Sequence, residues 1–264
     1  MKRAFSVLAV SAFLIVGGAW AGPARPVVVE LYTSQSCGSC VSADQLLARL
    51  TKRHDVVALS FAVNYWDILG WKDTMATDAA TRRQKAYAAV LGKGGVYTPQ
   101  MIVDGTIDVV GSRPDDAFSA IGEELMAVTK CEDKHCNRKH PLQPGDVPNA
   151  VGIDAIHMDD GTVRIALAAV PAGTRHFDAT VWFFTLRRAV TVKIGGGENQ
   201  GKTLSYHNVV QDIKAVGKWN GAAAGYTVSY EGLKASPQDN VAIVVQQGGF
   251  GRVIGARLLE PAHK

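Results

Sequence analysis

The chain has 264 residues, of which 47% are hydrophobic and 20% charged, with 28 Lys plus Arg against 24 Asp plus Glu. These proportions are typical of globular proteins and exclude a disordered chain, a collagen-like repeat and a small disulfide scaffold. The formal charge of +4 gives no electrostatic basis for nucleic-acid binding. At roughly 100 to 200 residues per domain, we expect two domains.

Residues 1–21 have the layout of a secretory signal. Lys2 and Arg3 precede an apolar run that ends in Ala19-Trp20-Ala21, with small residues one and three positions before the expected cleavage site. An uncleaved membrane anchor is the alternative, because residues 4–21 carry no charge and approach a spanning length. We expect cleavage and a periplasmic or secreted protein without a membrane span, in a compartment where disulfides persist.

The next segment predicts a β-α-β unit. Residues 26–33 are a β-branched run of strand length, a polar turn with two cysteines follows at 34–39, and residues 42–50 carry apolar side chains at helical spacing. A second buried strand is expected at 56–63. Because the helix lies between two nearby strands, a parallel crossover is the economical topology.

The remainder of the first half alternates between helices and strands. Composition predicts a helix over 74–91, and apolar spacing predicts an amphipathic helix over 115–130. Strands are expected at 96–104 and 106–110, and the first of them holds Pro99. An internal strand does not accommodate proline without a special reason, so this proline marks either a sheet edge or a functional position.

The second half has a different pattern. Residues 131–150 contain three prolines and no periodicity, which indicates a linker. Turn signals then separate short strand candidates, without a convincing helix, so we expect a smaller antiparallel sandwich at 151–264 after an α/β domain at 22–130. The seven strand candidates are 151–157, 162–170, 179–187, 203–211, 225–231, 241–247 and 252–259.

Cys37 and Cys40 form the constellation that carries chemistry. They follow a buried strand at the start of a helix, whose N-terminus stabilises a thiolate and lowers the pKa of Cys37. Cys40, one turn further on, would resolve a mixed disulfide formed by Cys37. The alternatives are an inert local disulfide and half of a zinc site, but no further ligands lie at the spacing of a zinc ribbon.

With these residues the first half resembles a thioredoxin-fold domain. In that superfamily a proline after a cis peptide bond faces the active-site disulfide and leaves the preceding backbone free to pair with substrate. Thr98 and Pro99 match this element, which implies a substrate-binding role for both. An edge-strand or bulge proline is the alternative. The predicted fold class is therefore an α/β thioredoxin-like domain followed by a smaller all-β, sandwich-like domain.

A closer resemblance covers essentially the whole mature chain. It is to an uncharacterised family of secreted bacterial thioredoxin-like proteins, defined as a domain of unknown function, and it implies fold and location but no activity. Members often carry His and Asp where this chain has Ala62 and Asn64, so those two positions are not assigned a titrating role. The runs that carry the resemblance are ELYTSQSCGSC, NYWDILGWKD, TRRQKAYA, GVYTPQMIVDG and GENQGKTLSYHNVV.

Three residues near the cysteines are further candidates. Glu30 lies on the strand before the disulfide, roughly where thioredoxins keep a buried carboxylate, and could act as general base for Cys40. The alternative is a glutamate that faces solvent at a strand edge. Tyr65 and Trp66 could line a substrate groove, although aromatic residues at this density are more often part of a core.

A second cysteine pair lies in the linker. Cys131 and Cys136 are expected to form a structural disulfide, as nearby cysteines of exported proteins commonly do. Exchange with the first pair is one alternative, and a zinc or copper site completed by His135 and His140 is another. The glycines at 195–197 lack the ending of a phosphate loop, so we interpret them as a turn.

Together these features predict an exported thiol-disulfide oxidoreductase. It needs no dissociable cofactor or metal, because the disulfide carries two electrons, and its partners would be a protein substrate with thiols or a disulfide and a redox partner protein. Two other functions stay open: a binding or adaptor protein with a structural disulfide, and a periplasmic metal-binding protein that uses the second Cys/His cluster.

Overall fold

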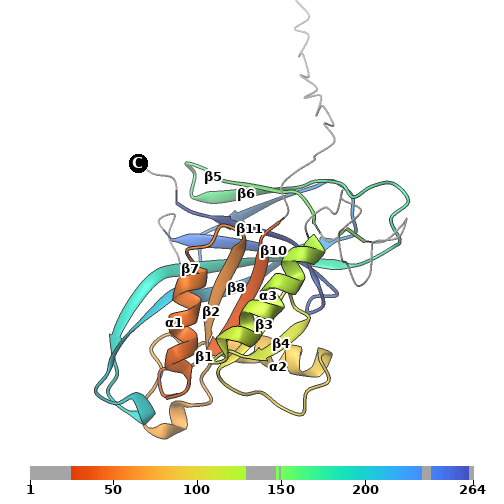
Figure 1. The fold of residues 1–264 in the computed structure, drawn as a ribbon. Coiled ribbons are helices and arrows are strands. Elements are labelled where there is room, and N and C mark those ends of the chain that lie inside the picture. Colours follow the sequence, from red (N-terminus) through yellow and green to blue (C-terminus); the bar gives the residue numbers. More distant parts are fainter. Residues whose placement is uncertain (1–24, 129–146, 149, 234–238, 262–264) are drawn as a thin grey trace, which may run out of the picture.

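The computed structural model describes residues 25–128, 147–148, 150–233 and 239–261 (Figure 1). The expected signal segment, Cys131 and Cys136 lie outside these residues. The elements of the described residues are β1 (Val27–Thr33), α1 (Cys40–Leu50), β2 (Val56–Ala62), η1 (Asp67–Leu69), α2 (Asp78–Val90), β3 (Gln100–Val103), β4 (Ile107–Val110), α3 (Pro114–Val128), β5 (Ile153–His157), β6 (Thr162–Leu167), β7 (Ala179–Lys193), η2 (Gly197–Asn199), β8 (Thr203–Trp219), β9 (Ala224–Ser229), β10 (Asn240–Gln247) and β11 (Val253–Leu259).

The predicted β-α-β unit is present at the start of the chain. β1 and β2 are parallel, from Val27 opposite Val56 to Thr33 opposite Ala62, and α1 connects them. All seven residues of each strand are buried, as the continuous apolar runs predict for a sheet covered on both faces. The antiparallel strand β3 pairs with the other edge of β1, and β4 follows β3.

The predicted succession of a thioredoxin-like α/β domain and a smaller all-β domain is wrong. Four strands of the second half continue the sheet of the first, giving a mixed eight-stranded sheet in the order β11-β10-β7-β8-β2-β1-β3-β4. The junction is the parallel pairing of Ser60 in β2 with Val209 in β8. The periodicity of a strand sets which faces are buried but not which strand lies beside it, and the free edge of β2 accepted β8.

The described chain is consequently mostly β, with only three α-helices around the large sheet. β5, β6 and β9 form a separate three-stranded antiparallel sheet. Among the described residues no helix has both the length and the apolar character needed to cross a membrane.

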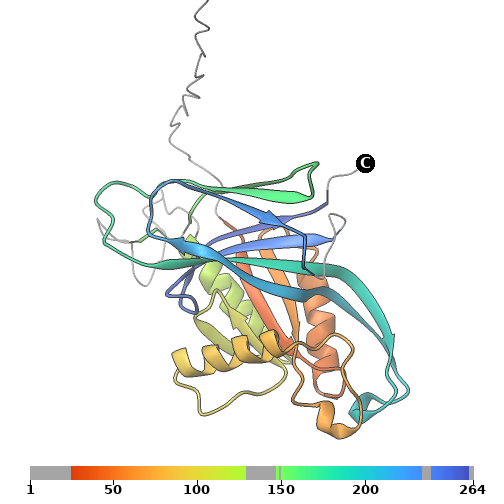
Figure 2. The same cartoon turned by 180° about the vertical axis from the view of Figure 1, so that it is seen from behind.

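The large sheet is covered on both faces (Figures 1 and 2). Side chains of α2, including Ala80 and Tyr87, pack on one face with Phe61 and Phe184. On the other face α1 and α3 cover the part that contains β1 and β3. The small sheet packs against the part that contains β7 and β10. Burial of these apolar clusters is the main stabilising contribution to a fold of this kind.

β7 and β8 are long enough to extend beyond the large sheet as a hairpin arm. They pair along 15 and 17 residues, whereas β10 pairs with β7 only from Ala179 to Leu186. The outer part of this hairpin runs past α1 (Figure 2). Its tip lies beside the loops at the N-terminal end of that helix. The predicted turn at 195–197 forms part of this tip, here called the arm tip (residues 194–202).

Candidate functional site

Cys37 and Cys40 form a disulfide at the first residue of α1. The turn that precedes the helix, here called the cysteine turn (residues 34–39), is closed by backbone hydrogen bonds from Cys37 N to Ser34 O at 3.1 Å and from Cys40 N to Cys37 O at 3.2 Å. Both cysteines are 0% exposed. The placement of the pair after β1 and at a helix N-terminus is therefore as the sequence predicts.

Thr98 lies directly against the disulfide. Its hydroxyl donates a hydrogen bond to Cys37 Sγ at 3.3 Å, and Ser39 Oγ lies 3.4 Å from the same sulfur. The Thr98–Pro99 peptide bond is cis, which is the form that the resemblance implies. Pro99 is buried just before β3, and its carbonyl accepts from Gly111 N at 2.8 Å. The structure thus brings together Cys37, Cys40, Thr98 and Pro99.

The arm tip holds the cysteine turn from one side. The amide of buried Asn199 donates to Gln35 O at 3.0 Å and to Cys37 O at 2.9 Å. Glu198 Oε2 accepts from Gly38 N at 2.7 Å, and Glu198 N donates to Ser36 O at 3.1 Å. These contacts satisfy backbone groups that cysteine-turn geometry leaves without a helical partner.

A glycine permits this close approach. Gly197 has a φ of +70°, in the left-handed region, and a side chain there would place Cβ 2.8 Å from Ser36 Cβ. The sequence interpretation recognised this glycine run as a turn but assigned no role to Glu198 or Asn199. Nothing local in the sequence could have done so, because their partners lie about 160 residues earlier in the chain.

The segment between β2 and α2 holds the cysteine turn from the other side. Asp73 Oδ2 accepts from Gln35 N at 2.8 Å, and Trp71 Nε1 donates to Gln35 Oε1 at 2.8 Å. Gln35 Nε2 in turn donates to Thr74 Oγ1 at 2.9 Å. The cysteine turn is therefore held between two segments from different halves of the chain.

Tyr65 and Trp66 lie in this same segment and are half-buried against the core on the α2 face. Burial raises the pKa of Tyr65, whereas contacts with Gln84 and Thr98 oppose the rise, so this ring lies beside Thr98. The next turn, η1, exposes two apolar side chains, Ile68 at 88% and Leu69 at 42%. Tyr65 thus combines packing with a position close to Thr98, whereas Trp66 is placed by its packing against the core.

Glu30 lies away from the cysteines. On β1 it points to the face that α2 covers, whereas its neighbour Leu31 packs in the α1 core. Its carboxylate is bidentate to Arg83, with Nε to Oε2 and Nη2 to Oε1 both at 2.7 Å, and accepts from the hydroxyls of Tyr87 at 2.7 Å and Tyr32 at 2.9 Å. This geometry gives no support to Glu30 as general base for Cys40.

The Glu30 site is a buried ion pair surrounded by aromatic rings. Five rings lie 5.0 to 5.9 Å from the Arg83 guanidinium, namely those of Phe61, Tyr87, Trp182, Phe184 and Phe250. Burial alone would lower the pKa of Arg83, but the carboxylate of Glu30 outweighs it and raises the pKa. Burial and the charge of Glu30 raise the pKa of Tyr32, so its proton stays in place.

Two other buried carboxyl groups, Asp44 and Asp73, lie close to the cysteine turn, and the sequence interpretation gave neither a role at the cysteines. Asp44 follows Cys40 by one helical turn, is 7% exposed and borders a cavity of about 280 Å³ between α1 and β8. Burial raises the pKa of Asp44 well above its ordinary value, a contact with Thr33 opposes the rise and the charge of Asp73 adds to it. Burial also raises the pKa of Asp73, against the opposing backbone hydrogen bonds from Gln35 and Met75. The available signal was the position of Asp44 on the buried face of an amphipathic helix, between Ala43 and Leu47.

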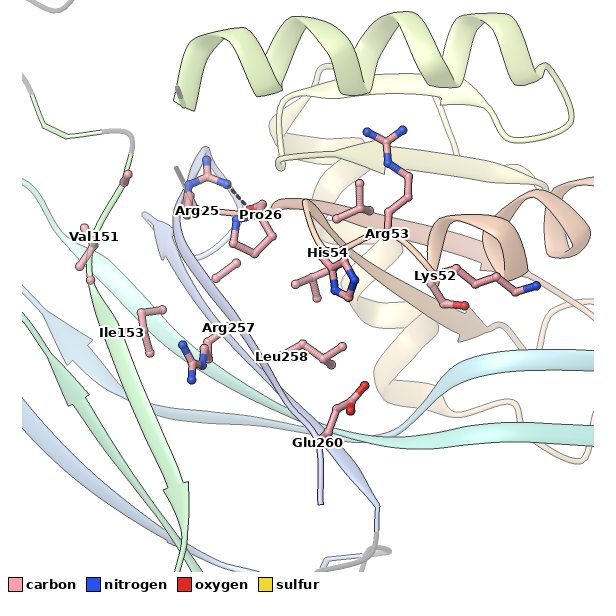
Figure 3. A pocket seen from close by; sticks show the side chains of 16 residues that line it. Arg25, Pro26, Lys52, Arg53, His54, Val151, Ile153, Arg257, Leu258 and Glu260 are labelled. Carbon is pink, nitrogen blue, oxygen red and sulfur yellow. Dashed lines mark hydrogen bonds between the residues drawn. The ribbon is translucent and has the colours of Figure 1, made fainter. Parts of the chain in front are cut away.

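A larger cavity, of about 650 Å³, lies at the opposite end of β1. Arg25, His54, Arg257 and Glu260 are among the residues around it (Figure 3). Its buried arginine, Arg25, is bound to Asp104 at 2.6 Å and to Val253 O at 2.6 Å. No cysteine is among the described residues that line this cavity.

No metal site is found in the described part of the chain, where no three His, Cys, Asp or Glu side chains cluster suitably. The predicted Cys131–Cys136 disulfide and its metal-binding alternative, with His135 and His140, lie outside the described residues. Both stay predictions.

Comparison with known proteins gives a family and two similar structures. Residues 28–246 match the model of a family described as protein of unknown function (DUF1223). A protein from Agrobacterium tumefaciens with a crystal structure is 29% identical in sequence to this chain. The comparison covers 92% of this chain and 98% of that one, with a TM-score of 0.70. HBP35 of Porphyromonas gingivalis, at 14% identity and a TM-score of 0.53 over 92% of this chain and 79% of that one, shares the fold alone. No curated protein matches the chain.

Proposed function

This chain belongs to the DUF1223 family, and we propose that it is an exported thiol-disulfide oxidoreductase with a thioredoxin-like active site built into a mixed sheet. The observation that carries the proposal is the Cys37–Cys40 disulfide at the N-terminus of α1, with the Thr98 hydroxyl 3.3 Å from Cys37 Sγ. A helix N-terminus and a hydroxyl donor both stabilise a thiolate on this sulfur.

The exchange proceeds through a mixed disulfide. A thiolate of the partner protein attacks Cys37 Sγ, and Cys40 leaves as a thiolate. A second partner thiolate then attacks the partner sulfur of the mixed disulfide, which releases Cys37. The partner gains a disulfide, and the Cys37–Cys40 pair takes up its two electrons; the reverse sequence reduces a partner disulfide. The relative potentials of the two proteins set the net direction, and a redox partner protein restores the starting state.

Asp44 takes the place of Glu30 as the proton acceptor in this proposal. Residues four apart on a helix lie on the same face, so the Asp44 carboxyl is next to Cys40. A carboxyl whose pKa is raised by burial holds and releases a proton closer to neutral pH than an exposed one. It would receive the proton of the Cys40 thiol when that cysteine resolves the mixed disulfide.

The surface around Thr98 suits a polypeptide partner. The backbone of Thr98 would pair with the partner chain, as the thioredoxin resemblance implies, and Pro99, whose carbonyl is bonded to Gly111 N, would hold it in position. Tyr65 lies close to Thr98. Trp66 and the exposed Ile68 follow Tyr65 in the chain, and in this proposal they would contact apolar side chains of the partner. No dissociable cofactor enters this chemistry. Export to the periplasm or the medium rests on the signal-like residues 1–21.

The test is the reduction potential of the Cys37–Cys40 pair. Protein lacking residues 1–21 is equilibrated with graded glutathione buffers and alkylated, and the labelled cysteines are located by mass spectrometry. A reversible potential between about −270 and −120 mV supports an exchanging pair. A pair that stays oxidised below about −300 mV, with Cys37 resistant to alkylation until unfolding, overturns the proposal.

Complete burial favours one second candidate, a binding or adaptor protein whose disulfide is structural. Cys37 is 0% exposed, whereas an exchanging sulfur must be reached by its partner. This candidate predicts that a Cys37→Ser, Cys40→Ser double variant loses stability yet retains its partner. The oxidoreductase instead predicts that Cys40→Ser alone traps partner proteins as reducible mixed disulfides.

A further inference from the structure

Glu198 places a negative charge at Gly38, one of the two residues between the cysteines. Its Oε2 accepts from Gly38 N at 2.7 Å, and a Cβ on Gly38 would lie only 3.0 Å from the same oxygen. Although Glu198 is exposed, its backbone is fixed by the hydrogen bond to Ser36 O and by its buried neighbour Asn199. The carboxylate is thus held at the cysteine turn by the arm tip and not by its own side chain alone.

This position matters because the partial positive charge at the start of α1 lowers the pKa of Cys37 in the reduced protein. Gly38 directly precedes Ser39, the N-cap of α1, and follows Cys37 in the chain. By accepting from Gly38 N, Glu198 adds a full negative charge beside the end of the helix that stabilises the thiolate. A thiolate formed there is consequently less stable than it would be at an unoccupied helix N-terminus.

Other charged groups surround the turn. Asp73 accepts from Gln35 N, Asp44 is buried on α1, Asp67 accepts from Asp73 N, and Lys202 Nζ donates to Asn199 Oδ1 at 2.9 Å. Asp73 bonds the turn before the first cysteine, whereas Glu198 bonds the turn between the two. Of these groups, Glu198 is the one that accepts from the amide directly after Cys37, so its charge acts most directly on that cysteine.

We propose that Glu198 is a positioning residue that lowers the reduction potential of the Cys37–Cys40 pair by disfavouring the Cys37 thiolate. The inference rests on the proposed exchange function. It assigns the arm of the second half a chemical role, which is to make the pair a weaker oxidant than its place at a helix N-terminus alone would give.

Two variants separate charge from contact. Glu198→Gln keeps the size of the side chain and an oxygen that accepts from Gly38 N but removes the charge, and Glu198→Ala removes both. Asp159→Asn, an exposed change in the β5–β6 turn, controls for net charge. In glutathione buffers we expect the equilibrium constant to shift about tenfold toward the reduced pair in both Glu198 variants, equivalent to a potential about 30 mV more positive, and not in Asp159→Asn.

The thiolate pKa provides a second readout that does not need exchange. In a Cys40→Ser background, the ultraviolet absorbance of the Cys37 thiolate is followed against pH with and without Glu198→Gln. We expect a lower Cys37 pKa in the Gln variant. An unchanged pKa, or a potential that shifts in Glu198→Ala but not in Glu198→Gln, overturns the inference. Failure of the wild-type pair to exchange with glutathione overturns the proposed function, while the pKa measurement still decides the role of Glu198.

Discussion

The Glu30 ion pair and the cysteine turn are both attached to β1, and both are buried, but they are built in opposite ways. The oxygens of Glu30 are taken up by Arg83, Tyr32 and Tyr87 inside a shell of aromatic rings. The cysteine turn is held mainly through its backbone, by Asn199, Glu198 and Asp73. The first arrangement holds a charged pair through its side chains, whereas the second holds a disulfide through the peptide groups around it. Burial of a carboxylate near a disulfide is therefore a poor guide to its chemistry unless its hydrogen-bond partners are known.

Breaking the ion pair should have the largest effect on stability and none on the cysteines. Arg83→Leu leaves Glu30 buried without its cation, and we expect a loss of about 3–5 kcal/mol in the free energy of unfolding. Urea denaturation measures it. Arg53→Leu, which breaks the exposed pair with Asp55, is the control and should cost less than about 1 kcal/mol. A changed potential of the Cys37–Cys40 pair in Arg83→Leu would contradict the separation of the two regions.

Removing the amide that anchors the arm tip comes next. Asn199→Ala leaves Gln35 O and Cys37 O without their donor, at an expected cost of about 2–3 kcal/mol. Thermal unfolding gives the loss, and the rate of reduction by dithiothreitol should rise because the turn is released. Asn220→Ala, at an exposed asparagine, serves as control. Equal reduction rates in wild type and Asn199→Ala would show that the arm tip does not restrain the turn.

Asp44 should behave unlike Glu30 because its burial is poorly compensated. Since its pKa is raised in the folded state, ionisation costs stability as pH rises from the unfolded value of about 3.9 through the folded pKa. Asp44→Asn should thus gain about 1–2 kcal/mol near neutral pH, and the gain should vanish below about pH 4. Urea denaturation across pH tests this. A gain independent of pH would mean that the carboxyl is not the cause.

The smallest effect on stability is expected at Thr98. Thr98→Val keeps the shape of the side chain and removes the hydroxyl that donates to Cys37 Sγ, so the free energy of unfolding should change by less than about 1 kcal/mol. Exchange with glutathione should slow severalfold, because the thiolate loses a donor. Thr191→Val on the outer arm is the matched control. An unchanged exchange rate would remove Thr98 from the site.

The sequence predicted the secondary-structure elements better than it predicted which elements lie side by side. The β-α-β unit and the position of Cys37 and Cys40 follow from local patterns, because apolar runs and a polar turn are local properties. The face of Glu30 does not, since all seven residues of β1 are buried and hydrophobicity no longer distinguishes its two sides. The pairing of β2 with β8 and the contacts of Glu198 depend on residues about 150 positions apart or more, for which a single sequence carries no signal.

The arm that binds the cysteine turn also determines when, during synthesis of the chain, the cysteines can be covered. Gly38 and Glu198 are separated by 160 residues, so a ribosome adding roughly 5–20 residues per second makes the cysteine pair roughly 10–30 seconds before it makes the residues that cover it. Until then neither Glu198 nor Asn199 can bind the cysteine turn, so the site cannot be completed before most of the chain has been made.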